Sequence, residues 1–385
     1  MPLLTEAYGM LDDLCLGYIT SAFDDLDSDN VPKWHHKLLH AWCGKQRTPS
    51  RTVTADDLSA HDEMWPEMQL AVACGPRLAD ALSGRVAYTE LLFPGGSMDA
   101  VLPVYESAVV GSFYNAAIVA AMSAILTNQG KEWQPAVLEI GAGTGATASS
   151  LLPLLDDHGC RRYAFTDVSE VFLRQARTRF AKYGFLEYLL LNIDADPRLQ
   201  GFALRSNDII VATNVLHATP YMRNTMTNCH RLLSRSGLLL VNELVETDPF
   251  AQITFGLTDG WWLFSESGDP ERVGQDSPLL SWKQWESLLA DCGFEHSQCI
   301  QGDAFLTRQA LIVGQAATGG AATDAAQRVP ASQSIQFISG GTGGLGLLTA
   351  RLMVESASCG TLLLASRSGR IAKGSEADWA WIESS

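Results

Sequence analysis

The segment from Val137 to Gly145 constrains the fold of this 385-residue chain more than any other. It reads Val-Leu-Glu-Ile-Gly-Ala-Gly-Thr-Gly, so a short apolar run leads into glycines at 141, 143 and 145. A short apolar run is consistent with a buried strand of a parallel sheet. The glycines allow a tight turn and let bare backbone approach a ligand. The segment therefore predicts a strand, a loop and a helix that cradle a nucleotide-like ligand.

The spacing of these glycines distinguishes two kinds of ligand-binding loop. A dinucleotide-binding loop has the spacing Gly-x-Gly-x-x-Gly, whereas here the third glycine comes one residue earlier. The pattern from Glu139 to Gly145 instead resembles motif I of class I S-adenosylmethionine-dependent methyltransferases, in which the loop passes under the methionine part of the cofactor. A glycine turn without a ligand is the remaining interpretation.

The chain after residue 131 alternates between predicted strands and helices, as in a doubly wound parallel α/β sheet. The expected parallel strands cover residues 137–140, 162–166, 187–192, 208–213 and 237–243. A final pair at 295–300 and 310–313 is expected to form the hairpin that closes the sheet in class I methyltransferases. The predicted fold class is a class I methyltransferase sheet.

Four parts are expected along the chain. Residues 1–130 show helical periodicity and predict either a lid over the active site or a cap that only adds core. Residues 131–315 hold the methyltransferase core, and the small residues of 316–333 predict a flexible linker. Residues 334–385 predict a partial nucleotide-binding segment.

That last segment resembles the opening strand, phosphate loop and helix of a short-chain dehydrogenase, here the start of a ketoreductase. Its loop contains Gly340, Gly344 and Gly346, and Arg367 is placed to meet the 2'-phosphate of NADP. The catalytic residues of that family would lie beyond Ser385. NADP is therefore expected only if the ketoreductase were completed.

Composition excludes several classes of function. The formal net charge of -16 argues against nucleic acid as a substrate, because a phosphate backbone is bound through clustered Lys and Arg. No apolar run approaches the roughly 20 residues of a membrane span, and a cytoplasmic location is the default expectation. Eight scattered cysteines without a Cys-x-x-Cys pair predict no metal site.

Two aspartates follow predicted strands. In the methyltransferase core, Asp167 would accept hydrogen bonds from the cofactor ribose and Asp194 would bind the adenine amino group. Each of them is also compatible with a helix cap or a turn.

A histidine and a glutamate stand after two neighbouring strands, where catalytic groups gather in open parallel sheets. His217 lies in the segment that begins at Asn214, and Glu243 ends the next strand. A carboxylate that fixes an imidazole makes a general base. Methyl transfer to carbon needs such a base, so the pair favours an acidic carbon between two carbonyls. Alternatively His217 caps a helix and Glu243 is a solvated strand end.

Taken together, these motifs resemble the C-methyltransferase domain of polyketide synthases. The segments that carry the resemblance are 91–97, 113–115, 139–145, 165–169, 214–219 and 260–264. The resemblance implies methylation of the alpha carbon of a beta-ketoacyl thioester on the phosphopantetheine arm of an acyl carrier protein, among neighbouring polyketide synthase domains.

The same resemblance assigns roles to single residues. His217 would remove the alpha proton, and Glu243 would orient His217. Asn214 would position the cofactor or the enolate. The acyl tunnel would be lined by Tyr114, Trp261 and Trp262, although the two tryptophans also suit a core. Two other functions stay open: a free-standing O- or N-methyltransferase of a small metabolite, and a non-catalytic structural module.

Overall fold

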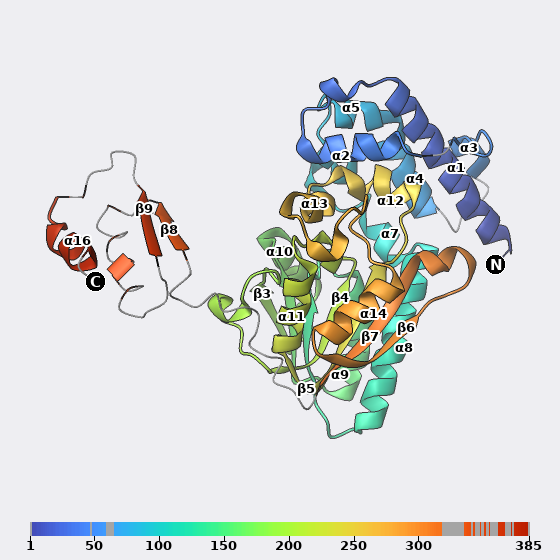
Figure 1. Cartoon of the computed structure of the whole chain (residues 1–385). Helices are drawn as coiled ribbons and strands as arrows, with labels where there is room; N and C mark the ends of the chain where they lie inside the picture. The colour runs from blue at the N-terminus through green and yellow to red at the C-terminus, as the bar shows by residue number, and fades with distance from the viewer. Residues whose placement is uncertain are drawn as a thin grey trace. The chain divides into compact units, whose positions relative to one another are not determined.

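The computed structural model describes residues 2–46, 48–58 and 65–317, and in the C-terminal part residues 335–339, 342, 347, 350, 351, 354, 361–365, 371 and 373–383. The chain forms two compact units, Met1–Thr318 and Gly319–Ser385 (Figure 1).

The larger unit is built on a seven-stranded sheet with the order β3-β2-β1-β4-β5-β7-β6. Strands β1 to β5 are parallel, and β7 pairs antiparallel with both β5 and β6. The doubly wound sheet and its closing hairpin are therefore confirmed. The strands are β1 (Ala136–Ile140), β2 (Arg162–Asp167), β3 (Leu186–Leu190), β4 (Asn207–Thr213), β5 (Leu233–Leu244), β6 (Phe294–Ile300) and β7 (Gln309–Ala316).

Helices cover both faces of this sheet because its central strands are apolar on both sides. In β1, Val137 faces one buried cluster, whereas Leu138 and Ile140 face the other. The first cluster is completed by α8 (Val109–Gln129), α9 (Ala146–His158) and α10 (Glu170–Arg179), and the second by α11 (Met222–Leu232) and α14 (Trp282–Asp291).

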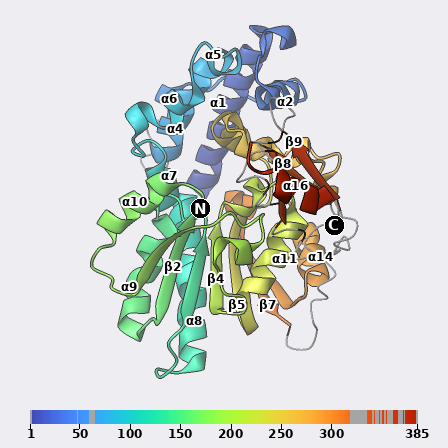
Figure 2. The same ribbon diagram turned by 90° about the vertical axis from the view of Figure 1, so that its left-hand side faces the viewer.

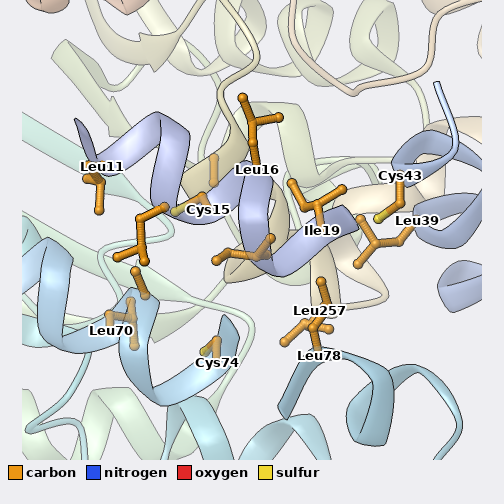
Figure 3. Close-up of a cluster of buried hydrophobic side chains, with 14 of the residues drawn as sticks. Leu11, Cys15, Leu16, Ile19, Leu39, Cys43, Leu70, Cys74, Leu78 and Leu257 are labelled. Atoms are coloured by element: carbon orange, nitrogen blue, oxygen red, sulfur yellow. The ribbon is translucent and has the colours of Figure 1, made fainter. Parts of the chain in front are cut away.

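A helical subdomain precedes the sheet in the sequence and lies beyond one end of it (Figures 1 and 2). Its core joins Leu11 and Cys15 to Leu70 and Leu78, and Leu257 from a later segment packs among them (Figure 3). The helices are α1 (Pro2–Asp24), α2 (Trp34–Cys43), α3 (Ala55–Leu58), α4 (Trp65–Cys74), α5 (Leu78–Leu82), α6 (Tyr88–Leu92) and α7 (Leu102–Glu106). Two later helices, α12 (Pro249–Ile253) and α13 (Leu263–Ser267), join this core.

The helical subdomain ends before α8 and not at residue 130, where its boundary is expected. Helix α8 belongs to the sheet layer, since Ile118, Met122 and Leu126 pack against β1, β4 and β5. Helix α8 is also long and apolar enough to span a membrane by length and composition alone. The expectation that no apolar run approaches that length was therefore wrong, although the buried face of α8 packs on the sheet.

The smaller unit contains a parallel pair of strands, β8 (Ile335–Ser339) and β9 (Thr361–Ala365), and the helix α16 (Glu376–Glu383). Strand β8 lies at the start of the segment 334–385, where the opening strand is expected. The predicted nucleotide loop, with Gly340, Gly344 and Gly346, and the predicted phosphate ligand Arg367 lie outside the described residues. The ketoreductase resemblance therefore stays a prediction.

Candidate active site

A cavity of about 330 Å³ lies between the carboxyl ends of β1, β4 and β5 and the helical subdomain. The sheet contributes the glycine loop after β1, the segment after β4 and the end of β5. The subdomain contributes mainly apolar side chains from the segments around α6, α7 and α12. The cavity thus joins the predicted cofactor loop to His217 in one space.

The glycine loop after β1 forms one wall of the cavity. A Cβ on Gly141 would lie 2.1 Å from Cγ2 of Val215, and one on Gly145 would lie 2.8 Å from the ring of Phe180. Both glycines have positive φ, as does Gly143, where a Cβ would meet only the carbonyl oxygen of Gly141, at 3.8 Å. Close packing under the loop and its left-handed backbone explain the glycines, and the loop's backbone lines the cavity.

Glu139 lies at the bottom of this loop and is almost fully buried. Its Oε2 accepts a hydrogen bond of 2.8 Å from the hydroxyl of Tyr163. Burial raises the pKa of Glu139 to about 8, and the nearby carboxyl of Asp167 adds to the shift. A ligand that brings positive charge to this carboxyl would offset the cost of ionising it.

Asp167 ends β2 and braces the glycine loop. Its Oδ2 accepts from the backbone N–H of Gly143 (3.0 Å), and its Oδ1 accepts from that of Ser169 (2.8 Å). Asp167 does not line the cavity in this structure. Asp194 lies beyond β3, and its Oδ1 is buried without a partner among the described residues. The predicted ribose and adenine contacts stay predictions.

The structure brings His217 and Glu243 together. Glu243 Oε1 accepts from the backbone N–H groups of Val215 (2.9 Å) and Leu216 (2.7 Å), and its Oε2 lies 2.6 Å from Nδ1 of His217. Because the carboxylate accepts, Nδ1 carries the hydrogen and Nε2 is the basic nitrogen. Glu243 is fully buried, so it is not a solvated strand end.

The segment that carries His217 is shaped by Asn214, which has a left-handed backbone with φ of 47°. Asparagine is among the residues that tolerate this conformation. Its side-chain oxygen accepts from the backbone N–H of Leu244 (3.3 Å). Asn214 also lines the cavity, between the glycine loop and His217.

Of the three aromatic residues predicted to line an acyl tunnel, only Trp261 lines the cavity described above. The ring of Trp261 meets the His217 ring edge to face, with centroids 5.2 Å apart, and lines the cavity. Trp262 packs in the core instead, and its Nε1 donates to the carbonyl of Gly256. Tyr114 is likewise a core residue, since its hydroxyl donates to the carbonyls of Leu306 and Gln309. The structure thus places Trp262 and Tyr114 in the core and not in the lining of this cavity.

Sequence reasoning missed Arg272, which is almost fully buried beneath the His217 segment. Its guanidinium donates to the carbonyls of His217 (2.8 Å) and Thr219 (2.6 Å), and its Nε donates to Asp269 (2.5 Å). The only signal was an acid three residues before an arginine, a common surface pattern. Tyr8, Glu67 and Asp248 also line the cavity, and no motif marks them.

Comparison with protein-family models matches residues 138–239 to the methyltransferase domain family. Among curated proteins, the chain is 38% identical over 247 residues to polyketide synthase ThaG of Burkholderia thailandensis, covering 62% of this chain and 4% of ThaG. It is 32% identical over 274 residues to clavatol synthase claF of Penicillium crustosum, covering 69% of this chain and 10% of that synthase. The chain thus matches a small part of each much longer relative.

The solved structures that resemble this chain also include methyltransferases. The carbon methyltransferase of DszA superposes with a TM-score of 0.73 and 27% identity, covering 83% of this chain and 93% of that one. The methyltransferase domain of the citrinin polyketide synthase gives a TM-score of 0.70 and 26% identity, covering 80% of this chain and 89% of that one. The chain therefore contains a methyltransferase domain with the class I S-adenosylmethionine-dependent fold, similar to the methyltransferase domains of polyketide synthases.

Proposed function

We propose that this chain transfers a methyl group from S-adenosylmethionine to the alpha carbon of a beta-ketoacyl thioester carried by an acyl carrier protein. The observation that carries the proposal is the His217–Glu243 pair, in which His217 lines the same cavity as the glycine loop and Glu243 is buried behind it. Methyl transfer to oxygen or nitrogen often needs only proximity, whereas a carbon acceptor must first lose a proton.

The cavity suits S-adenosylmethionine as the methyl donor. The residues that would hold it are Glu139, Gly141, Gly143 and Asn214, which line one wall, with Gly145, Asp167 and Asp194 as further predicted contacts. A carboxyl whose pKa is raised by burial, as in Glu139, fits a ligand with positive charge. When bound, S-adenosylmethionine supplies an electrophilic methyl group on a positively charged sulfur.

The chain's own residues would then generate the nucleophile. Nε2 of His217 takes the alpha proton, and the electron pair of the broken C–H bond passes into the enolate. Glu243 keeps the hydrogen on Nδ1 and stabilises the imidazolium that forms. Trp261 packs against the imidazole ring and limits its movement. Arg272 fixes the backbone from which His217 projects.

The apolar wall fits an acyl chain. Val101, Val104, Phe250 and Phe255 line the cavity on the side of the helical subdomain, as expected for a site that takes a hydrocarbon chain. The structural relatives named as carbon methyltransferases support a carbon acceptor, and the polyketide synthases among the relatives support an acyl carrier protein and neighbouring synthase domains as partners.

Intact-mass spectrometry tests the proposal. Acyl carrier protein loaded with an acetoacetyl group is incubated with this protein and S-adenosylmethionine. A gain of one methylene mass on the acyl arm is expected. Methylation of a free phenol or acid, with none on the carrier, would favour a free-standing O- or N-methyltransferase. Failure to bind S-adenosylmethionine in calorimetry would favour a structural module.

A further inference from the structure

The apolar wall of the cavity contains a cluster of polar side chains that the proposed mechanism does not use. Tyr8 from α1, Glu67 from α4 and Asp248 before α12 line the cavity on the side of the helical subdomain. These residues are far apart in the sequence, and the fold brings them together among apolar side chains.

Glu67 has one oxygen that is bound and one that is free. Its Oε1 accepts a hydrogen bond of 2.7 Å from the hydroxyl of Tyr8. Its Oε2 is buried and has no hydrogen-bond partner within the part of the chain that the structure describes. The residue is 4% exposed. An unpaired buried carboxyl oxygen costs free energy, so a ligand in the cavity that donates to Oε2 would recover that cost.

The neighbours of Glu67 hold it in place. The ring of Tyr8 stacks on that of Phe305, with centroids 4.1 Å apart, so the hydroxyl that binds Oε1 is fixed. Asp248 is already engaged, because its Oδ1 accepts from the N–H of Ala251 at the start of α12. The first turn of α4, which carries Glu67, favours an acidic side chain. The free acceptor is thus preorganised.

The cluster of Tyr8, Glu67 and Asp248 is separate from the cofactor side of the cavity. Glu139 has Tyr163 and Asp167 as its neighbours, whereas Glu67 has Tyr8 and Asp248. Burial, together with the charge of Asp248, raises the pKa of Glu67 to about 7. Near neutral pH the carboxyl is therefore present in both forms, and a hydroxyl can pair with either since it donates and accepts.

We propose that Glu67 is a specificity residue that selects an acyl chain carrying a hydroxyl group, through a hydrogen bond between that hydroxyl and Oε2. The identification of the ligand as an acyl thioester rests on the proposed function. An acidic ligand is disfavoured by the two carboxyls, and a plain hydrocarbon leaves Oε2 unpaired. The pantetheine arm also carries hydroxyl and amide groups, so the test compares ligands that share this arm.

Calorimetric binding tests the inference without methyl transfer. The ligands are pantetheine thioesters of a beta-ketooctanoyl chain, either plain or with one hydroxyl on the fifth or the seventh carbon. For the full chain, one hydroxylated ligand is expected to bind about 10-fold more tightly than the plain one, the worth of one hydrogen bond to a buried carboxyl. In Tyr8→Phe/Glu67→Leu, which replaces both partners by apolar groups, this preference is expected to vanish.

Tyr8→Phe alone is the matched control, because it keeps both oxygens of Glu67 and is expected to keep the preference. If the double variant does not fold, Glu67→Met replaces it. Equal binding of all three ligands to the unmodified protein, or the same preference in the variant that lacks Glu67, would overturn the inference. Failure of methylation with intact ligand preference would instead count against the proposed function alone.

Discussion

Among single residues, Glu243 shows how one buried carboxylate serves both the backbone and a side chain. Two of its hydrogen bonds come from N–H groups of the His217 segment and the third joins His217 itself. A glutamine at this position has only one acceptor oxygen, so either the backbone or the imidazole loses its partner. The carboxylate therefore sets both the position and the tautomer of the imidazole.

Glu243→Gln is accordingly expected to lower the rate of methylation at least 100-fold, within the range of general-base effects, while the affinity for S-adenosylmethionine stays within about 2-fold. Turnover by mass spectrometry and binding by calorimetry measure the two quantities. Glu246→Gln changes an exposed acid nearby and is the control. A glutamine variant that turns over normally would show that the carboxylate is dispensable.

Glu139 predicts a pH dependence of stability in the ligand-free protein. Its pKa rises from an ordinary 4.5 to about 8 in the fold, so the folded state binds more protons between these values. The free energy of unfolding should therefore fall as the pH rises from about 4.5 to about 8. Denaturant titrations across this range should show a smaller decline for Glu139→Gln. The exposed Glu295→Gln should behave as the unmodified protein, and identical declines in all three would contradict the assignment.

Sequence alone identified the residues whose position follows from a strand end. His217 and Glu243 could be paired in advance because both follow neighbouring parallel strands. The sequence could not decide whether Tyr114 and Trp262 lie in the core or at the cavity wall, since an aromatic side chain in a helical segment fits both equally well. Glu67 and Arg272 were missed because their environment is created by segments distant in the sequence.

At the scale of elements, the short turn Leu216–Ala218, labelled η6, is held from two sides. Glu243 at the end of β5 accepts from the backbone N–H of Leu216 in the turn and of Val215 just before it. Arg272 donates to the carbonyl of His217 within the turn and to that of Thr219 just after it. Strand β5 was predictable from its apolar run. The segment after α13 has no periodicity that marks it as part of the site, so its contribution appeared only in the fold.

Arg272→Met tests this support. Asp269 would be left buried without its ion-pair partner, and the expected loss of stability is about 3–5 kcal/mol. Asp269→Leu/Arg272→Met removes the unpaired charge and should recover much of that stability, but its rate of methylation should stay low because the His217 segment lacks its donors. Unfolding titrations and turnover measure both effects. Arg235→Met, at an exposed site, is the control; full turnover in the double variant would rule out a positioning role.

For the whole molecule, the sheet, the helical subdomain and the cavity all belong to the unit Met1–Thr318. The sequence predicted the boundary near residue 316 from a run of small residues, and it misplaced the one at residue 130. Near residue 130, α8 continues the helical pattern of the preceding segments. Only the burial of one face of α8 against the sheet assigns this helix to the methyltransferase core.

A chain that ends at Thr318 is therefore expected to keep the melting temperature, the affinity for S-adenosylmethionine and the methylation rate of the full chain. Scanning calorimetry and the mass assay compare the two proteins. A lower melting temperature with lost turnover would show that the C-terminal unit contributes to the methyltransferase fold.

In the proposed reaction, His217 is the base that makes a carbon nucleophile. The most direct test of this role is the methylation of acetoacetyl-loaded acyl carrier protein by the unmodified chain and by His217→Ala, followed by intact mass at saturating S-adenosylmethionine. We expect a methylene gain with the unmodified chain, a rate at least 100-fold lower with the variant, and equal cofactor affinity by calorimetry. A variant that methylates the carrier-bound chain at the normal rate would contradict this role of His217.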